Sequence, residues 1–172
     1  YTQYSEWADD RGYSASRITA FSPAYTTEST RCGWCEAWKK HGLLDYGKLY
    51  CENIDYELVK GFNPENELVL TSTLSHGDDC CHFEWAGCSF GDEAEYRATR
   101  EEKAAMGGDN LKDFLYHTGH VLSAMGRKYE ELLGVVKAKK IVDATLAQFE
   151  VLFGADKAAA LKEEAKLNFS LI

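Results

Sequence analysis

Residues 67–86, ELVLTSTLSHGDDCCHFEWA, decide the fold class. Residues 67–75 alternate between apolar and polar side chains and are rich in Val, Leu and Thr, and residues 81–86 alternate again. This period-two pattern is typical of strands that bury one face. The residues between the two runs, 76–79, are turn formers, so the sequence predicts an antiparallel β-hairpin.

Further strands are predicted before the hairpin, and helices on both sides of it. Residues 13–31 mix Tyr, Thr, Ser, Ile and Phe around Pro23, which indicates two short strands. Apolar residues at helical spacing, with caps at Gly61 and Gly134 and an N-cap at Asp109 or Asn110, predict the remaining elements. The expected helices are 36–41, 44–60, 109–133, 136–153 and 156–167.

These elements predict an α+β fold, in which an antiparallel sheet carries a layer of amphipathic helices packed on one face. With 172 residues, the chain is expected to form a single domain. Residues 1–88 carry the strands and all six Cys and four Trp, residues 89–108 are an acidic connector, and residues 109–172 are helical and expected to pack on the sheet.

Charge and hydropathy exclude several classes of partner. The formal net charge is −9 and the pI is about 5.0, so the chain repels phosphate backbones and nucleic acid is not expected as a partner. No apolar run reaches the roughly 20 residues of a membrane span, and the first residues lack the basic and apolar regions of a signal peptide. The sequence predicts a cytoplasmic protein without a membrane partner.

The cysteines carry most of the unusual chemistry of the sequence. Cys32 and Cys35 form a CxxC motif, Cys80 and Cys81 are adjacent, and two further thiols stand alone. A four-Cys zinc site would require a second CxxC, and a thioredoxin-like redox site would require a βαβ unit, so neither is favoured. Most of the thiols are interpreted as small buried hydrophobic groups, and a redox role of the CxxC pair stays open.

Two groups of polar residues have both a structural and a functional interpretation. Period two places Cys81, Phe83 and Trp85 on one face of the second hairpin strand, which is the expected core face. The opposite face then carries Cys80, His82 and Glu84, roughly aligned with Asp78. His117 and His120 lie three apart on one helix, where they can bind a metal together or pack as core histidines.

Four motifs, in order, carry a resemblance to a known family: Arg31-Cys32 with residues 36–39, residues 49–52 with Asp55, residues 61–64, and residues 77–83. Together they resemble the 2-aminothiazoline-4-carboxylate (ATC) hydrolase family. The hairpin is also similar, more distantly, to 4-vinyl reductase type ligand-binding domains. The resemblance implies a helical layer against a twisted antiparallel sheet, with a ligand pocket between them.

The resemblance also implies an activity and candidate residues. Water would add to the ring carbon between nitrogen and sulfur of a cyclic amidine, and the thiolate would leave, giving a carbamoylated cysteine. By motif match, Cys32, Cys51, Asp78 and Cys81 are candidate catalytic residues. Cys32 is the preferred nucleophile, because a helix N-terminus lowers the pKa of a thiol. Asp78 is a candidate base, although turn aspartates often only bond to their own backbone.

The remaining candidates concern the substrate contacts and the cofactor. Arg31 is a candidate clamp for the substrate carboxylate, and Trp85 and His120 are candidate substrate contacts, while His117 is added to the catalytic set. In some relatives of 4-vinyl reductase type, zinc is held by a helix Cys, a strand Glu and two hairpin Cys; only two of these ligands have counterparts here. No cofactor is therefore assigned, and a divalent metal stays open.

The sequence also leaves open a second function, a homodimer and a rearranged order of the chain. The pocket can instead serve a non-catalytic sensor or carrier of a small apolar ligand. The hairpin edge and the exposed helix faces are compatible with a homodimer. Since the helices of the related family precede the strands, whereas here they come last, the chain is also expected to be circularly permuted, with residues 106–109 as the former N-terminus.

Overall fold

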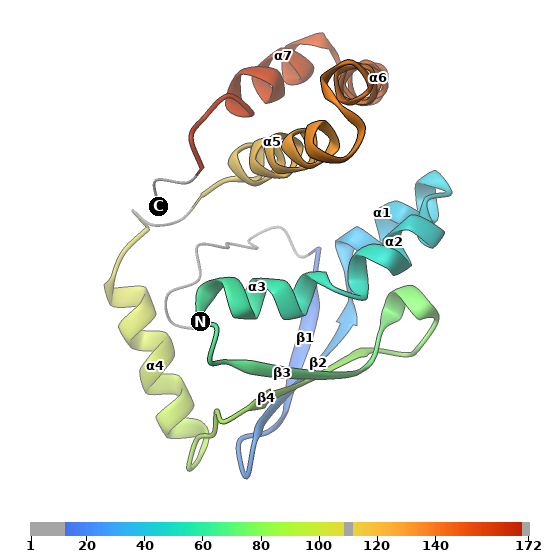
Figure 1. The fold of residues 1–172 in the computed structure, drawn as a ribbon. Helices are drawn as coiled ribbons and strands as arrows, with labels where there is room; N and C mark the ends of the chain where they lie inside the picture. Colours follow the sequence, from blue (N-terminus) through green and yellow to red (C-terminus); the bar gives the residue numbers. More distant parts are fainter. Residues whose placement is uncertain (1–12, 109–111, 170–172) are drawn as a thin grey trace. The chain divides into compact units, whose positions relative to one another are not determined.

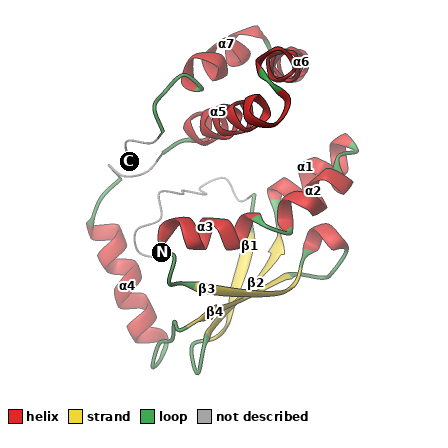
Figure 2. Cartoon of the chain, in the orientation of Figure 1, coloured by secondary structure: helices red, strands yellow, loops and turns green. Residues whose placement is uncertain are grey.

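The computed structural model describes residues 13–108 and 112–169. Contacts group the chain into two compact units, which divide between Asn110 and Leu111, and each unit is described here by itself. The first unit carries a four-stranded sheet with helices, and the second is helical (Figures 1 and 2). The fold class is therefore α+β, as predicted, and the expected packing of the 109–172 helices on the sheet stays a prediction.

The sheet is antiparallel throughout and joins two hairpins. Strands β1 (Ala15–Ala20) and β2 (Tyr25–Arg31) form the first hairpin, and β3 (Glu67–Ser72) and β4 (Cys81–Ala86) form the second. The strand order is β1-β2-β4-β3, because β2 pairs with β4. The predicted hairpin at residues 67–86 and the two strands expected within residues 13–31 are confirmed, although the first strand of the hairpin ends at Ser72 rather than Ser75.

The two faces of the sheet differ in chemistry. Phe83 and Trp85 of β4 face helix α3 (Ile54–Phe62), and the core there includes Val59 and Leu68, which are 3% and 6% exposed. The opposite face is polar: Glu28 accepts hydrogen bonds from Arg17 and lies 3.5 Å from His82 Nδ1. The period-two assignment of the β4 side chains to two faces is therefore correct.

The helix expected at residues 44–60 is two helices. α2 covers Leu44–Cys51 and α3 covers Ile54–Phe62, with a break at Glu52 and Asn53. Gly61 does not cap the second helix, which ends at Asn63. α1 (Gly33–His41) starts earlier than predicted and ends at Gly42, whose φ of 69° is left-handed, as a C-cap glycine requires. α1 packs against α2.

The connector at residues 89–108 contains helix α4 (Glu93–Ala105), which Asp92 caps by accepting a hydrogen bond from the Glu95 N–H. Its aromatic contacts tie it to one end of the sheet. The rings of Tyr25 and Tyr96 stack at 5.6 Å, and Phe90 lies edge-on to both. Burial beside Tyr96 raises the pKa of Tyr25 well above its usual range.

The helical unit consists of α5 (Phe114–Leu133), α6 (Val135–Phe153) and α7 (Ala155–Glu164), each in contact with the other two. Gly134 and Gly154, with φ of 79° and 95°, each end one helix and begin the next. The predicted N-cap at Asp109 or Asn110 lies outside the described residues, and α5 is capped by Asp113. The chain ends also lie outside them, so the permutation stays a prediction.

Candidate functional site

A cavity of about 240 Å³ lies between α3 and the sheet in the first unit. Its walls are apolar where α3 and the two central strands meet, with Phe83 and Trp85 from β4 and Val59 from α3. Its polar groups are three hydroxyls and one carboxyl. The full lining is Ser16, Thr27, Ser29, Asp55, Leu58, Val59, Leu68, Phe83 and Trp85. We call it the helix–sheet cavity.

Asp55 supplies the carboxyl of the cavity. It lies in the first turn of α3, at the spacing that brings it onto the same face as Leu58 and Val59. Burial raises the pKa of the Asp55 carboxyl above its usual value, because the charged form loses water. A carboxyl whose pKa is raised inside an apolar cavity is typical of a group that exchanges protons with a ligand.

Three thiols gather beside Asp55. Cys32 precedes α1 as its N-cap, Cys51 ends α2 and Cys81 begins β4, so three separate elements bring them together. Their proximity shows in their electrostatics: Cys51 and Cys81 each interact with Cys32 and with Asp55. We call Cys32, Cys51, Cys81 and Asp55 the thiol cluster.

Burial dominates the protonation of two of these thiols. It raises the pKa of Cys81 to about 11, and it raises the pKa of Cys51 as well. Neighbouring groups oppose the effect only partly: the Leu74 N–H donates to Cys81 Sγ at 3.3 Å, and the Ser75 side chain acts in the same direction on the pKa of Cys51. Both thiols are therefore protonated at neutral pH, which makes them weak nucleophiles.

The loop that joins β3 to β4 closes over the thiol cluster with a hydrogen-bonded network. It contains the short 3-10 helix Leu74–His76, which packs against α2. Thr73 Oγ1 lies 2.7 Å from His76 Nδ1, and Ser75 Oγ lies 3.3 Å from the same nitrogen. Ser75 is buried, with 2% of its surface exposed.

The structure brings together Cys32, Cys51 and Cys81, which the motifs singled out, and it puts Trp85 in the wall of the adjoining cavity. Asp78 is engaged in the loop instead, where its carboxylate accepts the Thr73 N–H at 2.7 Å. Arg31 forms a two-point ion pair with Glu36, with distances of 2.8 and 3.1 Å, and both side chains are exposed. Their proposed roles stay predictions.

His117 and His120 belong to the helical unit, so the structure does not test whether they join the thiols. His117 is buried on α5, 5.5 Å from the ring of Tyr116. The His120 ring stacks on Phe169 at 4.5 Å, with the two planes 4° apart. Within residues 13–108 and 112–169, no three His, Cys, Asp or Glu side chains are placed to hold a metal ion.

The sequence did not single out Asp55 or Ser75 as site residues, although Asp55 stands in a quoted motif. The available signal was a carboxylate on an apolar helix face, since Asp55 precedes Leu58 and Val59 by three and four residues. Ser75 carried no comparable signal, because serine is common in turns and its burial depends on the fold of the loop.

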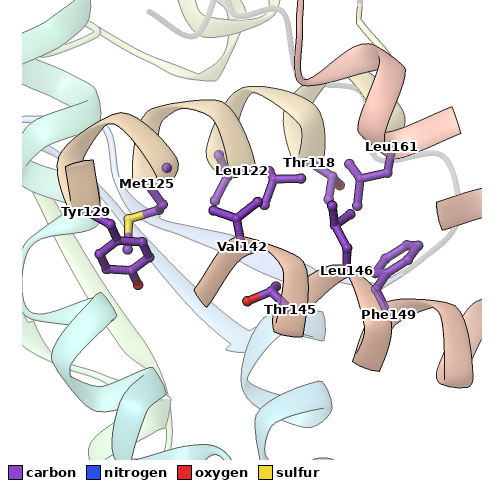
Figure 3. Close-up of a pocket in the computed structure, with 11 residues that line it drawn as sticks. Thr118, Leu122, Met125, Tyr129, Val142, Thr145, Leu146, Phe149 and Leu161 are labelled. Carbon is purple, nitrogen blue, oxygen red and sulfur yellow. The ribbon is translucent and has the colours of Figure 1, made fainter. Parts of the chain in front are cut away.

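The helical unit has a cavity of its own, of about 220 Å³, between α5, α6 and α7 (Figure 3). Met125, Leu146 and Phe149 give it an apolar lining. The hydroxyl protons of its two threonines are already donated within their own helices. Thr118 donates to the Phe114 carbonyl, and Thr145 donates to the Ile141 carbonyl. The cavity thus lacks the convergent polar groups that the helix–sheet cavity has.

The first unit is an α+β domain with a cavity between a helix and an antiparallel sheet, and with thiols and a carboxyl beside it. Residues 7–85 match the family model described as L-2-amino-thiazoline-4-carboxylic acid hydrolase. The chain is therefore ATC hydrolase-like over this segment, which holds every residue of the thiol cluster, and the resemblance read from its motifs is confirmed. No curated protein and no solved structure matches the chain. None of the described helices is both long and apolar enough to cross a membrane.

Proposed function

We propose that the first unit is a hydrolase that opens a small cyclic amidine, of the 2-aminothiazoline-4-carboxylate type, in the helix–sheet cavity. Water adds to the ring carbon between nitrogen and sulfur, the bond from that carbon to sulfur breaks, and the sulfur leaves and takes a proton. The product is an N-carbamoyl cysteine. The observation that carries the proposal is the Asp55 carboxyl, which lines the cavity opposite Phe83 and Trp85 and adjoins three thiols.

Asp55 is the proposed base. Its raised pKa makes its carboxylate a stronger proton acceptor than an exposed aspartate, so it can take a proton from the attacking water. The same negative charge attracts the protonated amidine, which is the more electrophilic form of the ring. The apolar walls formed by Phe83 and Trp85 strengthen this attraction, because they keep water away from the charge.

The thiols supply the opposite function. Because burial keeps Cys51 and Cys81 protonated, either can donate an S–H hydrogen bond that stabilises the departing sulfur, which takes up the proton that Asp55 removes from water. Cys32 is the N-cap residue of α1 and is the candidate for a covalent route in which its sulfur attacks the amidine carbon before water does.

The substrate carboxylate needs hydrogen-bond donors. The hydroxyls of Ser16, Thr27 and Ser29 face the cavity from neighbouring strands, with Ser16 and Ser29 joined at 2.8 Å. The Trp85 Nε1–H donates to Thr27 Oγ1 at 3.4 Å, which leaves the hydroxyl proton of Thr27 to be donated to a ligand. We propose that these hydroxyls bind the substrate carboxylate. Arg31, which pairs with Glu36, then lies outside the site.

The test follows free thiol released from 2-aminothiazoline-4-carboxylate, with the thiols of the protein subtracted as a blank. Turnover by the wild type, a loss of about 100-fold in Asp55→Asn and no change in Asp45→Asn support the proposal. Asp45 is a suitable control because it is an exposed aspartate of α2. Cys32→Ala separates the two routes: retained turnover indicates direct attack by water, and lost turnover a covalent intermediate.

A non-catalytic carrier is the second candidate, and the protonated thiols favour it. A cavity with two aromatic walls, beside which Cys51 and Cys81 stay protonated, can bind a small heterocycle without changing it. Calorimetric titration of the wild type with the same compound distinguishes the two. A heat of binding that saturates, without release of thiol, indicates a carrier. Release of thiol indicates the hydrolase.

A further inference from the structure

The sheet wall of the helix–sheet cavity presents its hydroxyls in a regular arrangement. Thr27 and Ser29 lie two residues apart on β2, so both side chains stand on the face that borders the cavity. Ser16 lies opposite Ser29 in the pairing of β1 with β2, and their Oγ atoms are 2.8 Å apart. Among the described residues that line the cavity, none is Lys or Arg. The hydroxyls are therefore the donors that this wall offers to a negatively charged group.

Trp85 determines how Thr27 takes part. Its indole N–H donates to Thr27 Oγ1 at 3.4 Å, from β4 to the neighbouring strand β2. The indole nitrogen is a donor only, so the Thr27 oxygen is the acceptor of this bond and the Thr27 proton points away from the indole. Both side chains are half-buried and line the cavity. Trp85 thus favours the orientation in which Thr27 is a donor towards a ligand.

Ser16 and Ser29 supply a second donor. Two hydroxyls carry two protons, and one of these protons lies between the two oxygens. The other proton can be donated to a ligand. Thr27 and Ser29 are two residues apart on one strand, so the two donors are about 7 Å apart at the backbone. Hydrogen bonds of about 2.7 Å from each donor leave room between them for the two oxygens of one carboxylate.

The opposite wall of the cavity carries the opposite chemistry. Asp55 faces the cavity from α3, where it offers a carboxyl to the ligand. A ligand carboxylate beside Asp55 would be repelled by its charge, whereas the strand hydroxyls attract it. The two walls therefore orient a ring that is cationic at one end and anionic at the other. Ser16 is exposed, so the anionic end lies at the side of the cavity that is nearer to solvent.

We propose that Thr27 is a specificity-determining residue that selects rings carrying a carboxylate, and that Trp85 is a positioning residue that keeps Thr27 oriented as a donor. The role rests on the proposed function, since it concerns the carboxylate end of the same substrate. A carboxamide in this place would turn an N–H group towards one of the two donors and would lose the charge, so it should bind more weakly than the carboxylate.

The test is calorimetric titration with 2-aminothiazole-4-carboxylate and with its carboxamide. Both rings are aromatic and serve as ligands that are not opened, so affinity is measured without turnover. The wild type should bind the carboxylate about tenfold more tightly than the carboxamide. Thr27→Val should weaken binding of the carboxylate by about tenfold and leave that of the carboxamide nearly unchanged. Thr27→Ser, which keeps the hydroxyl, should retain the preference.

Trp85→Phe tests the positioning role, because it keeps an aromatic wall and removes the N–H. It should weaken binding of the carboxylate about threefold to tenfold, with little change for the carboxamide. Thr26→Val is the matched control for Thr27→Val. Its hydroxyl lies 2.7 Å from that of Thr19, and Thr26 pairs with Glu84 on the opposite face of the sheet, so neither affinity should change.

A loss confined to the carboxylate supports the assignment. Equal affinity of the wild type for the two compounds, parallel losses for both in Thr27→Val, or an unchanged preference in Trp85→Phe overturns it. Release of thiol from 2-aminothiazoline-4-carboxylate is measured separately. A wild type that prefers the carboxylate but releases no thiol rejects the hydrolase and keeps the selection as that of a carrier, whereas release of thiol without the preference rejects the selection alone.

Discussion

The carboxylate of Asp78 accepts a hydrogen bond from the Thr73 N–H at 2.7 Å, while the Asp78 N–H donates to the Thr73 carbonyl at 3.3 Å. This double contact closes the loop that carries Ser75 and His76. The candidate catalytic base of the motif thus has a clear structural function, and substitution distinguishes the two roles.

Asp78→Ala is expected to lower the free energy of unfolding by about 1 kcal/mol, because the Thr73 N–H loses a charged acceptor on the surface. The midpoint of urea unfolding measures the change. Asp79→Ala, at an exposed neighbouring aspartate, is the control and should have little effect. A normal unfolding midpoint combined with lost release of thiol would instead establish Asp78 as a catalytic residue.

Gly47 allows α1 and α2 to approach closely, since a Cβ atom there would overlap the indole ring of Trp38. Gly47→Ala should therefore destabilise the unit by about 1–3 kcal/mol, as overpacking does. Gly61→Ala, near the end of α3, meets nothing within 4 Å and should stabilise the helix by up to about 1 kcal/mol. Thermal unfolding of the two variants compares them directly. Equal shifts in melting temperature would show that the Trp38 ring can move aside without a loss of stability.

The strand pattern predicted the sheet well because alternation depends only on which face is buried, and Phe83 and Trp85 do line the buried side. The helix pattern misled at residues 44–60. Its apolar positions stay in phase across the break at Asn53, which neither Gly nor Pro marks. Two of these positions, Tyr46 and Leu49, are 71% and 62% exposed, so period alone did not identify the core.

The sequence predicted those residues of the candidate site that are recognisable by their type and motif. It did not predict those whose environment depends on tertiary contacts. Cys32, Cys51 and Cys81 were selected by motif, and the fold of the first unit brings them together. Asp55 lines a cavity that only the packing of α3 on the sheet creates. The partner of Arg31, by contrast, lies five residues along the chain in a motif that the sequence analysis had quoted.

Cys81 should make the stability of the unit depend on alkaline pH. Since burial raises its pKa from 9.0 to about 11, the folded state holds the thiol proton more tightly than the unfolded chain does. Its contribution to stability is full below about pH 9 and falls as the pH rises towards 11. In urea unfolding, the difference in free energy of unfolding between wild type and Cys81→Ser should be smaller at pH 10 than at pH 8. Cys80→Ser is the control, for which this difference should stay the same at both pH values.

Asp55→Asn should stabilise the protein while it removes activity. Burial raises the pKa of Asp55 in the folded state, so its contribution to stability is full below its unfolded pKa, near 3.8, and is lost as the pH rises through the folded value. Asparagine is neutral at every pH. The variant should therefore melt at a higher temperature than the wild type at pH 7, and the gap should narrow at pH 4.

The exposed Asp45→Asn provides the comparison, because its carboxyl pairs only at the surface with Lys48. If Asp45→Asn and Asp55→Asn raised the melting temperature at pH 7 by the same amount, this result would contradict the burial of Asp55. A charge that costs stability in an apolar cavity is retained for its chemistry. Higher melting temperature together with about 100-fold slower release of thiol would thus connect the raised pKa of Asp55 to the opening of the ring.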